Sequence, residues 1–392
     1  MKILVLNSGS SSLKCQLFIN QESKASLTIE RIGEEKSAIT LISETETTHH
    51  TTTIATHHHA ITTLFELLKE SGIITHSKEI DGVGHRVVHG GAEFKKPTRI
   101  TQKVIERIHA LIPLAPLHNP ANLEGIKGIA THYPDLPQVA VFDTAFHQSM
   151  PEYASRYPLP YSLYEEASVR RYGFHGTSHN YVAKEASKLL QKPLESLNLI
   201  TLHLGNGASA TAIRQGKSID TSMGLTPLEG LMMGTRSGDI DPAIIAYLVR
   251  TQKYSVEAID HMLNKESGLK GICGSNEMRE VIARAKKGEE KSLLALEMYT
   301  YRIKKYIGAY MAILGSVDAI IFTGGIGEHA VEIREMVCAK MEESFGLILD
   351  PIKNRSHAPQ IHTAQSKIAL LVIATNEELE IAKQTEALLK GS

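Results

Sequence analysis

Short apolar runs alternate with longer stretches of helical periodicity through most of the chain. The runs that predict buried strands cover residues 3–6, 139–142, 199–204, 319–323 and 368–373. Apolar positions three or four residues apart predict helices over residues 181–190 and 293–314. This alternation favours an α/β fold, in which helices cover the faces of the sheets.

Two of the predicted helices carry N-terminal signals. A hydroxyl N-cap is expected at Ser178, directly before the helical pattern of residues 181–190. Another helix is expected to begin at Asp241 and Pro242. There an acidic cap is followed by a proline, whose missing N–H costs nothing in a first helical turn.

A hairpin pattern occurs twice. Residues 3–18 and residues 199–213 each consist of an apolar strand, a turn of small residues and a second alternating strand. Two copies of one supersecondary unit predict two similar domains, although hairpins of this kind also recur by chance.

Residues 44–59 are rich in threonine and histidine and end in His57, His58 and His59. Imidazole is a common zinc ligand, so a metal site is one interpretation. We favour a polar loop that leads into a surface helix, because apolar residues continue at helical spacing from Ala60 to Leu68.

Length and charge limit the classes of function. A chain of 392 residues suffices for two or three domains. Lys plus Arg number 42 and Asp plus Glu number 43, so the formal net charge is −1. No long-range field attracts nucleic acid, and we expect no nucleic-acid partner. The longest clean apolar run, residues 368–374, is far shorter than the ~20 residues of a membrane-spanning helix, so no membrane partner is expected.

The cysteines and the N-terminus bear on the compartment. Cys15, Cys273 and Cys338 are widely spaced and form no CxxC pair. They indicate neither a disulfide framework nor a zinc knuckle. The N-terminal stretch lacks the long apolar region of a secretory signal. We therefore expect a cytoplasmic protein.

Three predicted loops could bind phosphate: residues 7–12, 205–209 and 323–328. Each follows an apolar strand and is rich in glycine or small hydroxyl residues, so its backbone N–H groups can approach a phosphate closely. The sequence contains no GxxxxGK[ST], which excludes a P-loop. A dinucleotide fingerprint at residues 205–210 is disfavoured, because a strand pattern follows where a helix is required.

Two histidine pairs have the spacing of zinc ligands on a helix. His85 and His89 lie in a valine-rich segment that predicts a strand, where they would be roughly 13 Å apart. His175 and His179 lack the glutamate of a zincin motif. Neither pair predicts a metal site.

Nine stretches, spread from the first predicted strand to the last helix, carry a family resemblance. They are NSGSSSLK (7–14), GHRVVHGG (84–91), PLHNP (116–120), VFDTAFH (141–147), RRYGFHGTSH (170–179), HLGNGAS (203–209), DTSMGLTPLEGLMMGTRSGDIDP (220–242), FTGGIGEH (322–329) and TNEEL (375–379). On these stretches the sequence resembles the acetate kinase family, within the superfamily of sugar kinases, heat-shock ATPases and actin.

The resemblance implies a fold and a reaction. The fold is α/β, with two duplicated ribonuclease H-like (actin-like ATPase) domains flanking a nucleotide cleft. Residues 1–147, completed by a C-terminal helix over residues 379–392, would form one domain, and residues 148–378 the other. The reaction is reversible, Mg²⁺-dependent (or Mn²⁺-dependent) phosphoryl transfer from ATP to acetate, giving acetyl phosphate and ADP. The resemblance also implies a homodimer.

The resemblance assigns roles to individual residues. The catalytic positions are Asp143, His175 and Arg236, and Arg86 would bind the substrate carboxylate. The methyl group would be surrounded by Val88, Leu117, Phe174 and Pro227. The nucleotide would be bound by Lys14, His203, Leu204, Gly205, Asn206, Gly207, Glu277, Met278, Arg279, Gly325, Ile326, Gly327, Glu328 and His329, and the metal by Asn7 and Glu377. Two of these positions depart from the family pattern, because Asp is usual at Glu277 and Asn is common at His329.

Chemical reasoning refines the role of Asp143 and gives alternatives for Arg86, Arg236 and His175. A carboxylic acid substrate is already ionised at pH 7 and needs no general base, so we expect Asp143 to orient Arg86 or a metal-bound water. Arg86 could instead form a buried ion pair. For Arg236 the alternative is a salt bridge to Asp239 or Asp241, and His175 could be a core histidine.

The predicted substrate pocket is small. A valine and a phenylalanine leave little room, which favours acetate, although one methylene is worth only ~1–3 kcal/mol in such a pocket. A propionate kinase of the same family is therefore the alternative enzyme. An actin-like ATP-driven switch is the alternative from another class, and it would leave GHRVVHGG and RRYGFHGTSH without a role.

Overall fold

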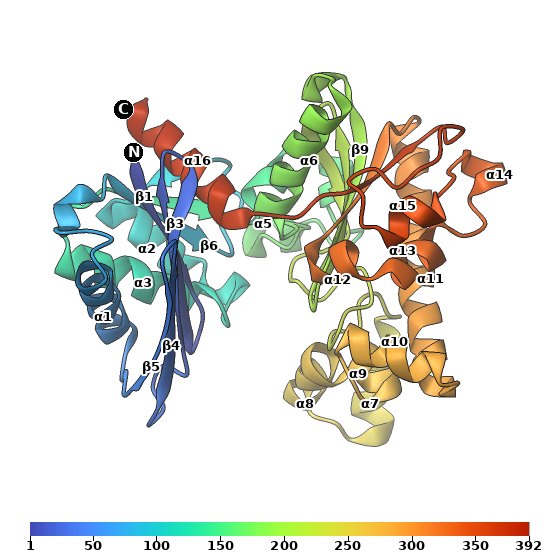
Figure 1. Ribbon diagram of the computed structural model, residues 1–392. Coiled ribbons are helices and arrows are strands. Elements are labelled where there is room, and N and C mark those ends of the chain that lie inside the picture. Colours follow the sequence, from blue (N-terminus) through green and yellow to red (C-terminus); the bar gives the residue numbers. More distant parts are fainter. Residues whose placement is uncertain (392) are drawn as a thin grey trace. The chain divides into compact units, whose positions relative to one another are not determined.

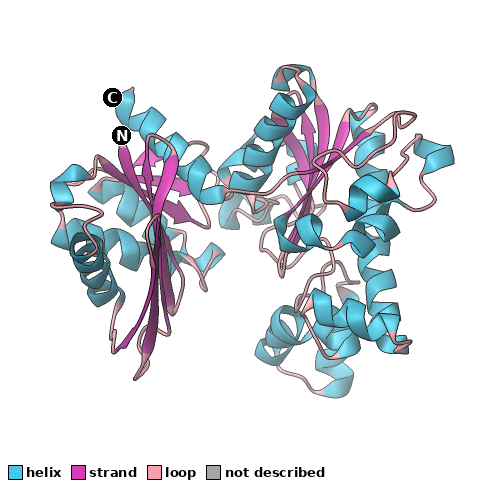
Figure 2. Ribbon diagram, in the orientation of Figure 1, coloured by secondary structure: helices cyan, strands magenta, loops and turns pink. Residues whose placement is uncertain are grey.

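The computed structural model describes residues 1–391, which form two compact units. Unit 1 comprises Met1–Phe146 and the chain from Asn376 onward, and unit 2 comprises His147–Thr375. Each unit is built on one sheet that mixes parallel and antiparallel strands and carries helices on it (Figures 1 and 2).

Unit 1 contains an eight-stranded sheet in the order β5-β4-β3-β2-β1-β6-β8-β7. Its strands are β1 (Lys2–Ser8), β2 (Ser12–Ile19), β3 (Glu22–Glu30), β4 (Ser37–Ser43), β5 (Thr47–Thr52), β6 (Gly82–Val87), β7 (Thr98–Arg99) and β8 (Gln138–Phe142). Its helices are α1 (His57–Glu70), α2 (Gln102–Ala110), α3 (Asn119–His132) and α16 (Glu377–Lys390).

The central strand β1 is buried on both faces, which explains its continuous apolar run. Leu4 and Leu6 pack with α1 and α3, whereas Ile3 and Val5 pack with Ile381 of α16. Successive side chains of a strand point to opposite faces, so covering both faces requires apolar residues at every position.

Unit 2 contains a five-stranded sheet in the order β11-β10-β9-β12-β13. The strands are β9 (Asn198–Leu204), β10 (Ala208–Arg214), β11 (Lys217–Thr221), β12 (Ala319–Thr323) and β13 (Ala369–Val372). The helices are α4 (Glu152–Ser155), α5 (Ser162–Ala167), α6 (Gly176–Leu190), α7 (Ala243–Gln252), α8 (Val256–His261), α9 (Gly268–Cys273), α10 (Met278–Lys286), α11 (Glu290–Leu314), α12 (Gly324–His329), α13 (Val331–Cys338), α14 (Glu342–Phe345) and α15 (Pro351–Arg355).

The two sheets share one pairing pattern. In unit 1, β3, β2 and β1 are antiparallel neighbours, and β1, β6 and β8 are parallel neighbours. In unit 2, β11, β10 and β9 are antiparallel, and β9, β12 and β13 are parallel. The two predicted hairpins are β1–β2 and β9–β10, and each opens its unit's copy of this pattern.

Four local predictions differ from the structure. Residues 47–52 are not loop but the edge strand β5, paired with β4. Residues 324–329 form the short helix α12 rather than a loop. α6 begins at Gly176, so Ser178 lies within its first turn and is not its N-cap. α7 begins at Ala243, directly after Pro242, while the Asp241 carboxylate accepts a hydrogen bond from Ala243 N at 2.9 Å.

Two further features concern the character of the helices and the state of the cysteines. Along residues 1–391, none of the helices combines the length and the apolar character that crossing a bilayer demands. Cys15, Cys273 and Cys338 are buried free thiols.

Candidate functional site

Arg86, Asp143 and Glu377 come together in unit 1. Arg86 lies on β6, Asp143 directly follows β8, and Glu377 is the first residue of α16. Since β6 and β8 are parallel neighbours, their carboxyl ends meet at one edge of the sheet. Asp143 accepts hydrogen bonds from Arg86 Nε at 3.2 Å and from Nη2, and Glu377 Oε2 lies 3.7 Å from Arg86 Nε. This bidentate pair fixes the plane of the guanidinium.

The close approach of α16 to β6 depends on Gly84. A Cβ on Gly84 would lie 2.4 Å from Thr385 Oγ1 and 2.8 Å from Ile381 Cγ2. A larger residue would push α16 away from the sheet, because the packed interface has no space to absorb it. Gly84 therefore helps to keep Glu377, at the start of the same helix, beside Arg86.

The charges of this cluster are unbalanced. Asp143 is almost fully buried, with 1% of its side chain exposed. Burial opposes the charge on Arg86, yet Asp143 and Glu377 together raise its pKa above the ordinary value. Burial, with added repulsion from Asp143 and Glu378, raises the pKa of Glu377 from 4.5 to about 7, although Arg86 acts in the opposite direction. An additional cation would relieve this excess of carboxylates.

We predict that Glu377→Gln stabilises the protein more at pH 8 than at pH 5. The folded-state pKa of Glu377 is raised, so the folded chain binds more protons than the unfolded chain between pH 4.5 and 7. The free energy of unfolding therefore falls as pH rises through this window. Glutamine stays neutral, and its advantage at pH 8 should be about 3 kcal/mol in urea unfolding.

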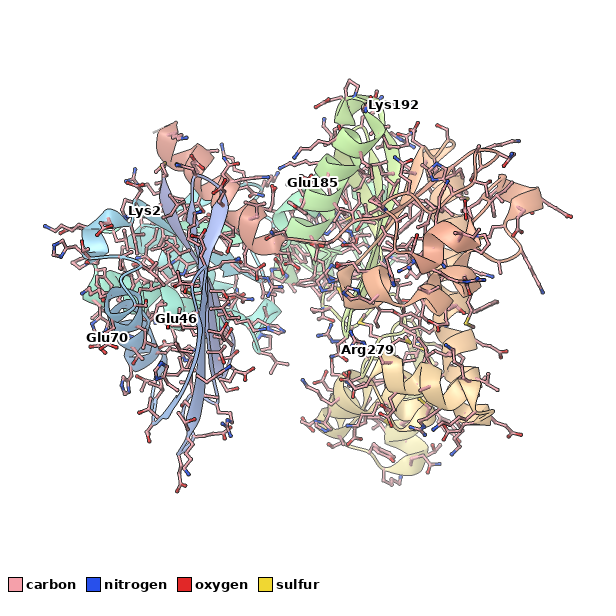
Figure 3. All side chains as sticks on the ribbon, viewed as in Figure 1. Lys2, Glu46, Glu70, Glu185, Lys192 and Arg279 are labelled. Atoms are coloured by element: carbon pink, nitrogen blue, oxygen red, sulfur yellow. The ribbon has the colours of Figure 1, made fainter. Side chains whose placement is uncertain are left out.

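The control for that variant is Glu70→Gln, on an exposed position of α1 (Figure 3). It also removes one negative charge, but far from any buried carboxylate cluster. An equal gain from both substitutions, or a Glu377→Gln gain that does not change with pH, would contradict the expected burial effect.

Asn7 and Lys14 lie directly opposite each other on β1 and β2. Opposite residues of an antiparallel pair share one face, so these two side chains are neighbours. Within residues 1–391, no group of three or more His, Cys, Asp or Glu side chains is arranged to hold a metal ion. Mg²⁺ commonly uses only one or two carboxylates and takes its other oxygens from phosphate and water. The oxygen donors of Asn7 and Glu377 fit an ion of that kind.

Two asparagines that sequence reasoning left without a role position the segment after β6. Asn122 Oδ1 accepts a hydrogen bond from Val88 N at 3.0 Å, and Asn119 Oδ1 accepts one from His89 N at 3.1 Å. Both asparagines are buried on the first turn of α3. Buried asparagines are unusual on an apolar helix face. Two asparagines three residues apart among the apolar residues of this helix are therefore the sequence feature that could have indicated their role. Leu117, just before α3, is 65% exposed.

In unit 2, His175 and Arg236 converge on the turn between β9 and β10. Gly205 N donates to Gly207 O at 3.0 Å and closes that turn. A Cβ on Gly207 would lie 3.4 Å from Arg236 Nη1 and 3.6 Å from His175 Nε2. The bare backbone at Gly207 thus leaves a small space that both side chains face.

Arg236 has no carboxylate partner among the described residues. It is half-buried, burial lowers its pKa, and its Nη1 donates to the carbonyl of Pro227 at 3.3 Å. Asp239 and Asp241 instead accept hydrogen bonds from backbone N–H groups at 2.8 and 2.9 Å. A partly buried cation without a counter-charge is costly, and it favours an anionic ligand.

His175 is held in an unusual conformation. Its φ of 56° lies in the left-handed region, and such strain persists only where the surroundings enforce it. Its ring stacks on His203 with centroids 4.2 Å apart, and its Nδ1 lies 2.9 Å from Ser209 Oγ. The hydroxyl of Ser178, expected as a helix cap, instead lies 2.8 Å from His203 Nδ1.

A pocket of about 530 Å³ opens beside the same turn. Its walls come from the turn and from α10, α12 and α13, and Arg279 is exposed near the start of α10 (Figure 3). The predicted nucleotide residues that line it are Gly205, Asn206, Glu277, Met278, Arg279, Gly325, Ile326 and His329. Those that do not are Lys14, His203, Leu204, Gly207, Gly327 and Glu328, and the lining residues not predicted are Asn276, Ile282, Ala283, Lys286, Ala330 and Glu332.

Arg334 is a further residue whose role the sequence analysis did not predict. It is fully buried, and its Nη1 donates to the carbonyls of Gly327 and Glu328 at 2.8 and 2.7 Å. Its Nε donates to Asn354 Oδ1 at 2.6 Å. This arginine fixes the end of α12 and so shapes one wall of the pocket.

The residues expected around a small acid fall into both units. Val88 and Leu117 belong to unit 1, and Phe174 and Pro227 belong to unit 2. Val88 and Phe174 are buried. The structure thus assembles three groups: Arg86 with Asp143 and Glu377, His175 with Arg236 at Gly207, and the pocket beside that turn.

Comparison with known proteins identifies relatives along the whole chain. The family model described as the acetokinase family matches residues 2–383. The acetate kinase of Sulfurovum sp. (strain NBC37-1) is 69% identical over 392 residues, covering 99% of this chain and 99% of that protein. The acetate kinase of Helicobacter acinonychis (strain Sheeba) is 52% identical over 401 residues and covers 100% of both.

Solved structures give the same picture for the fold. The crystal structure of Porphyromonas gingivalis acetate kinase matches with a TM-score of 0.94 at 44% identity, covering 99% of each chain. A propionate kinase from Francisella tularensis subsp. tularensis SCHU S4 matches with a TM-score of 0.93 at 45% identity, covering 98% of this chain and 99% of that one. Backbone similarity alone therefore does not separate the two substrates.

Proposed function

The chain belongs to the acetokinase family, and on that premise we propose that it transfers the γ-phosphoryl group of ATP reversibly to acetate, giving acetyl phosphate and ADP. The family match confirms the resemblance seen in the sequence, and the solved relatives confirm the α/β class with two mixed sheets. The observation that carries the proposal is Arg236, a half-buried cation that has no carboxylate partner within residues 1–391 and is aimed with His175 at a glycine turn.

Charge stabilisation is the role we assign to Arg236 and His175. Phosphoryl transfer passes through a loose transition state whose negative charge is spread over the equatorial oxygens, so the protein must supply fixed positive charge and donors. The turn from His203 to Gly207 would present backbone N–H groups to the phosphates, and the pocket beside it would hold the nucleoside. Lys14 would contribute a further positive charge.

Mg²⁺ is the divalent metal we propose, with Asn7 and Glu377 as the residues that would hold it. When bound, it neutralises charge on the nucleotide phosphates. The raised pKa of Glu377 supports this assignment, because a buried carboxylate that resists ionisation gains most from a nearby cation.

Arg86 is proposed to bind the acetate carboxylate, with Asp143 as its positioning residue. Asp143 holds the guanidinium through Nε and Nη2, which leaves Nη1 without a bond to this aspartate. Glu377 faces Nε at 3.7 Å, a longer contact that a bound metal can weaken. Acetate needs no deprotonation at pH 7, so orientation rather than base catalysis is the role of Asp143.

We predict that acetate has the highest kcat/KM among acetate, propionate and butyrate. Val88 is buried and its backbone is held by Asn122, so this residue cannot move aside freely for a longer acid. Each added methylene should cost roughly ten- to hundredfold. The measurement is ATP- and metal-dependent acyl phosphate formation, trapped with hydroxylamine.

The alternatives give different results in that assay. A preference for propionate would assign the chain to the propionate kinases and overturn our interpretation of Val88. ATP hydrolysis that no acid affects, without acyl phosphate, would favour a nucleotide-driven switch. The relatives at 69% and 52% identity are named acetate kinases, which supports the first outcome.

We further propose a cytoplasmic homodimer that pairs through the α7–α8 face, defined as Ile244, Ile245, Tyr247, Val249, Tyr254 and Val256. These side chains are 37–64% exposed, and α7 buries none of its residues. Apolar helices of this kind are normally covered. Arg250 is the single charged residue of α7, so two copies related by a two-fold axis can meet without strong repulsion.

Ile245→Glu is expected to convert this dimer to a monomer in light-scattering measurements of molar mass. A buried, unpaired glutamate at a two-fold interface costs several kcal/mol because it appears twice. Ile352→Glu, at an apolar residue of α15 that is 76% exposed, is the control and should leave the mass unchanged. A wild-type monomer, or a dimer that survives Ile245→Glu, would exclude this face.

A further inference from the structure

A series of buried polar side chains, each within hydrogen-bond distance of the next, ends at Nδ1 of His175. Thr201 Oγ1 lies 2.7 Å from His179 Nδ1, His179 Nε2 lies 2.8 Å from Ser209 Oγ, and Ser209 Oγ lies 2.9 Å from His175 Nδ1. Thr201, His179 and Ser209 are fully buried. This polar relay therefore links the strands β9 and β10 to the side of the His175 ring that faces away from Gly207.

His179 is neutral in this environment. Burial, with repulsion from His147 and His203, lowers its pKa well below the ordinary value. A neutral imidazole has one nitrogen that donates and one that accepts. Ser209 has a single hydroxyl proton, so it can donate to only one of its two histidine partners.

These limits leave two possible directions for the hydrogen bonds. In the first, Thr201 donates to His179 Nδ1, His179 Nε2 donates to Ser209, and Ser209 donates to His175 Nδ1. The proton of a neutral His175 then sits on Nε2. In the second, the bond between Ser209 and His175 is reversed, whichever way the other two bonds run, because a hydroxyl oxygen can accept from both histidines. His175 then carries its proton on Nδ1, with Nε2 either a bare lone pair or part of a cation.

The charge of Arg236 favours the first direction. Its Nη1 and His175 Nε2 both approach the point above Gly207, and along the described part of the chain no carboxylate pairs with Arg236. A second cation at this point would add repulsion, whereas a bare lone pair would repel the phosphoryl oxygens. A neutral ring with its N–H at Nε2 avoids both costs.

We propose that Ser209 and His179 are positioning residues that hold His175 as the neutral tautomer with its proton on Nε2. The kinetic part of this proposal rests on the proposed function, in which His175 donates to the transferring phosphoryl group. The tautomer itself can be measured without the reaction. Fixing the tautomer in advance gives the transition state a donor that needs no reorganisation.

The first test reads the tautomer directly. Long-range ¹H–¹⁵N correlation spectra of the full chain labelled with ¹⁵N-histidine distinguish Nδ1–H, Nε2–H and imidazolium rings, and His175→Gln identifies the His175 signals. We expect an Nε2–H ring at pH 7.5 in the wild type and a change of its ¹⁵N shifts in Ser209→Ala. An Nδ1–H ring or an imidazolium would overturn the proposal.

The second test separates kcat from KM. Ser209→Ala should lower kcat about ten- to hundredfold, as loss of a group that orients a catalytic side chain does, with the KM for acetate within about twofold. Thr201→Val should lower kcat in the same direction, because His179 loses the donor at its Nδ1. An unchanged kcat in both variants would overturn the proposal.

Thr211→Val is the matched control. Thr211 is also fully buried, faces Thr201 across the strands, and bonds to Thr221 rather than to a histidine. Thr211→Val should leave kcat and the His175 spectrum unchanged. If it lowered kcat as much as Ser209→Ala does, the effect of Ser209→Ala would be merely structural. A wild-type protein that makes no acetyl phosphate would refute the proposed function, while the spectra would still decide the tautomer.

Discussion

Arg236→Ala is expected to lower kcat for acetyl phosphate formation about 10³-fold, with little change in the KM for acetate. The guanidinium is a fixed charge aimed at the turn around Gly207, where the transferring group would lie. Cations that stabilise phosphoryl-transfer transition states are worth ~10³–10⁵ in rate. The measurement is kcat and KM by hydroxylamine trapping.

Stability provides the control for that variant. Arg236 has no carboxylate partner among the described residues, so its loss should leave the melting temperature unchanged or slightly higher. Arg355→Ala, at an exposed arginine of α15, should affect neither rate nor stability. A large loss of stability in Arg236→Ala would identify a structural cation and contradict the assignment.

Arg86→Ala is expected to lower kcat/KM for acetate about 10²–10³-fold and to destabilise unit 1. The first effect follows from the loss of a charged donor to the carboxylate. The second arises because Asp143, 1% exposed, would remain buried without the charge of Arg86, at a cost of about 3–5 kcal/mol. Acid-dependent initial rates and urea unfolding measure the two effects separately.

The double variant Arg86→Ala/Asp143→Ala distinguishes substrate binding from folding. Removing both charges should restore much of the stability, because the carboxylate of Asp143, 1% exposed, is gone and only the less buried Glu377 loses its contact with Arg86. Activity should remain low, since the group that binds the acid is still missing. If activity returned together with stability, Arg86 would be a structural residue only.

Much of the fold was predictable because it depends on local patterns. Apolar runs located β1, β8, β9, β12 and β13, and helical periodicity located α6 and α11. The errors arose where local signals were ambiguous. Residues 47–52 are almost entirely polar, and only pairing with β4 makes them a strand. Glycines 324, 325 and 327 suggested a loop, yet the adjoining structure fixes them as the start of α12.

Of the candidate site, the residues within recognisable motifs were predictable, whereas the residues that position them were not. Motif resemblance named Arg86, Asp143, His175 and Arg236, and the chemistry of an ionised substrate gave the expectation that Asp143 orients Arg86 or a metal-bound water. Asn119, Asn122, Arg334 and Ser209 were missed. Each acts through hydrogen bonds to residues far away in sequence, and no spacing rule connects such partners.

The sequence by itself determined the α/β class, the doubled hairpin, the near-zero net charge and the family. These properties follow from periodicity, composition and contiguous motifs, which are read over short distances along the chain. Only the tertiary structure decided that Arg86 is paired with Asp143 whereas Arg236 has no carboxylate partner in residues 1–391. It also decided that Glu377 resists ionisation and that Ser209 contacts Nδ1 of His175. Burial and hydrogen-bond partners are set when separate strands and helices pack together, so the charge and protonation of a side chain depend on neighbours that local sequence does not contain.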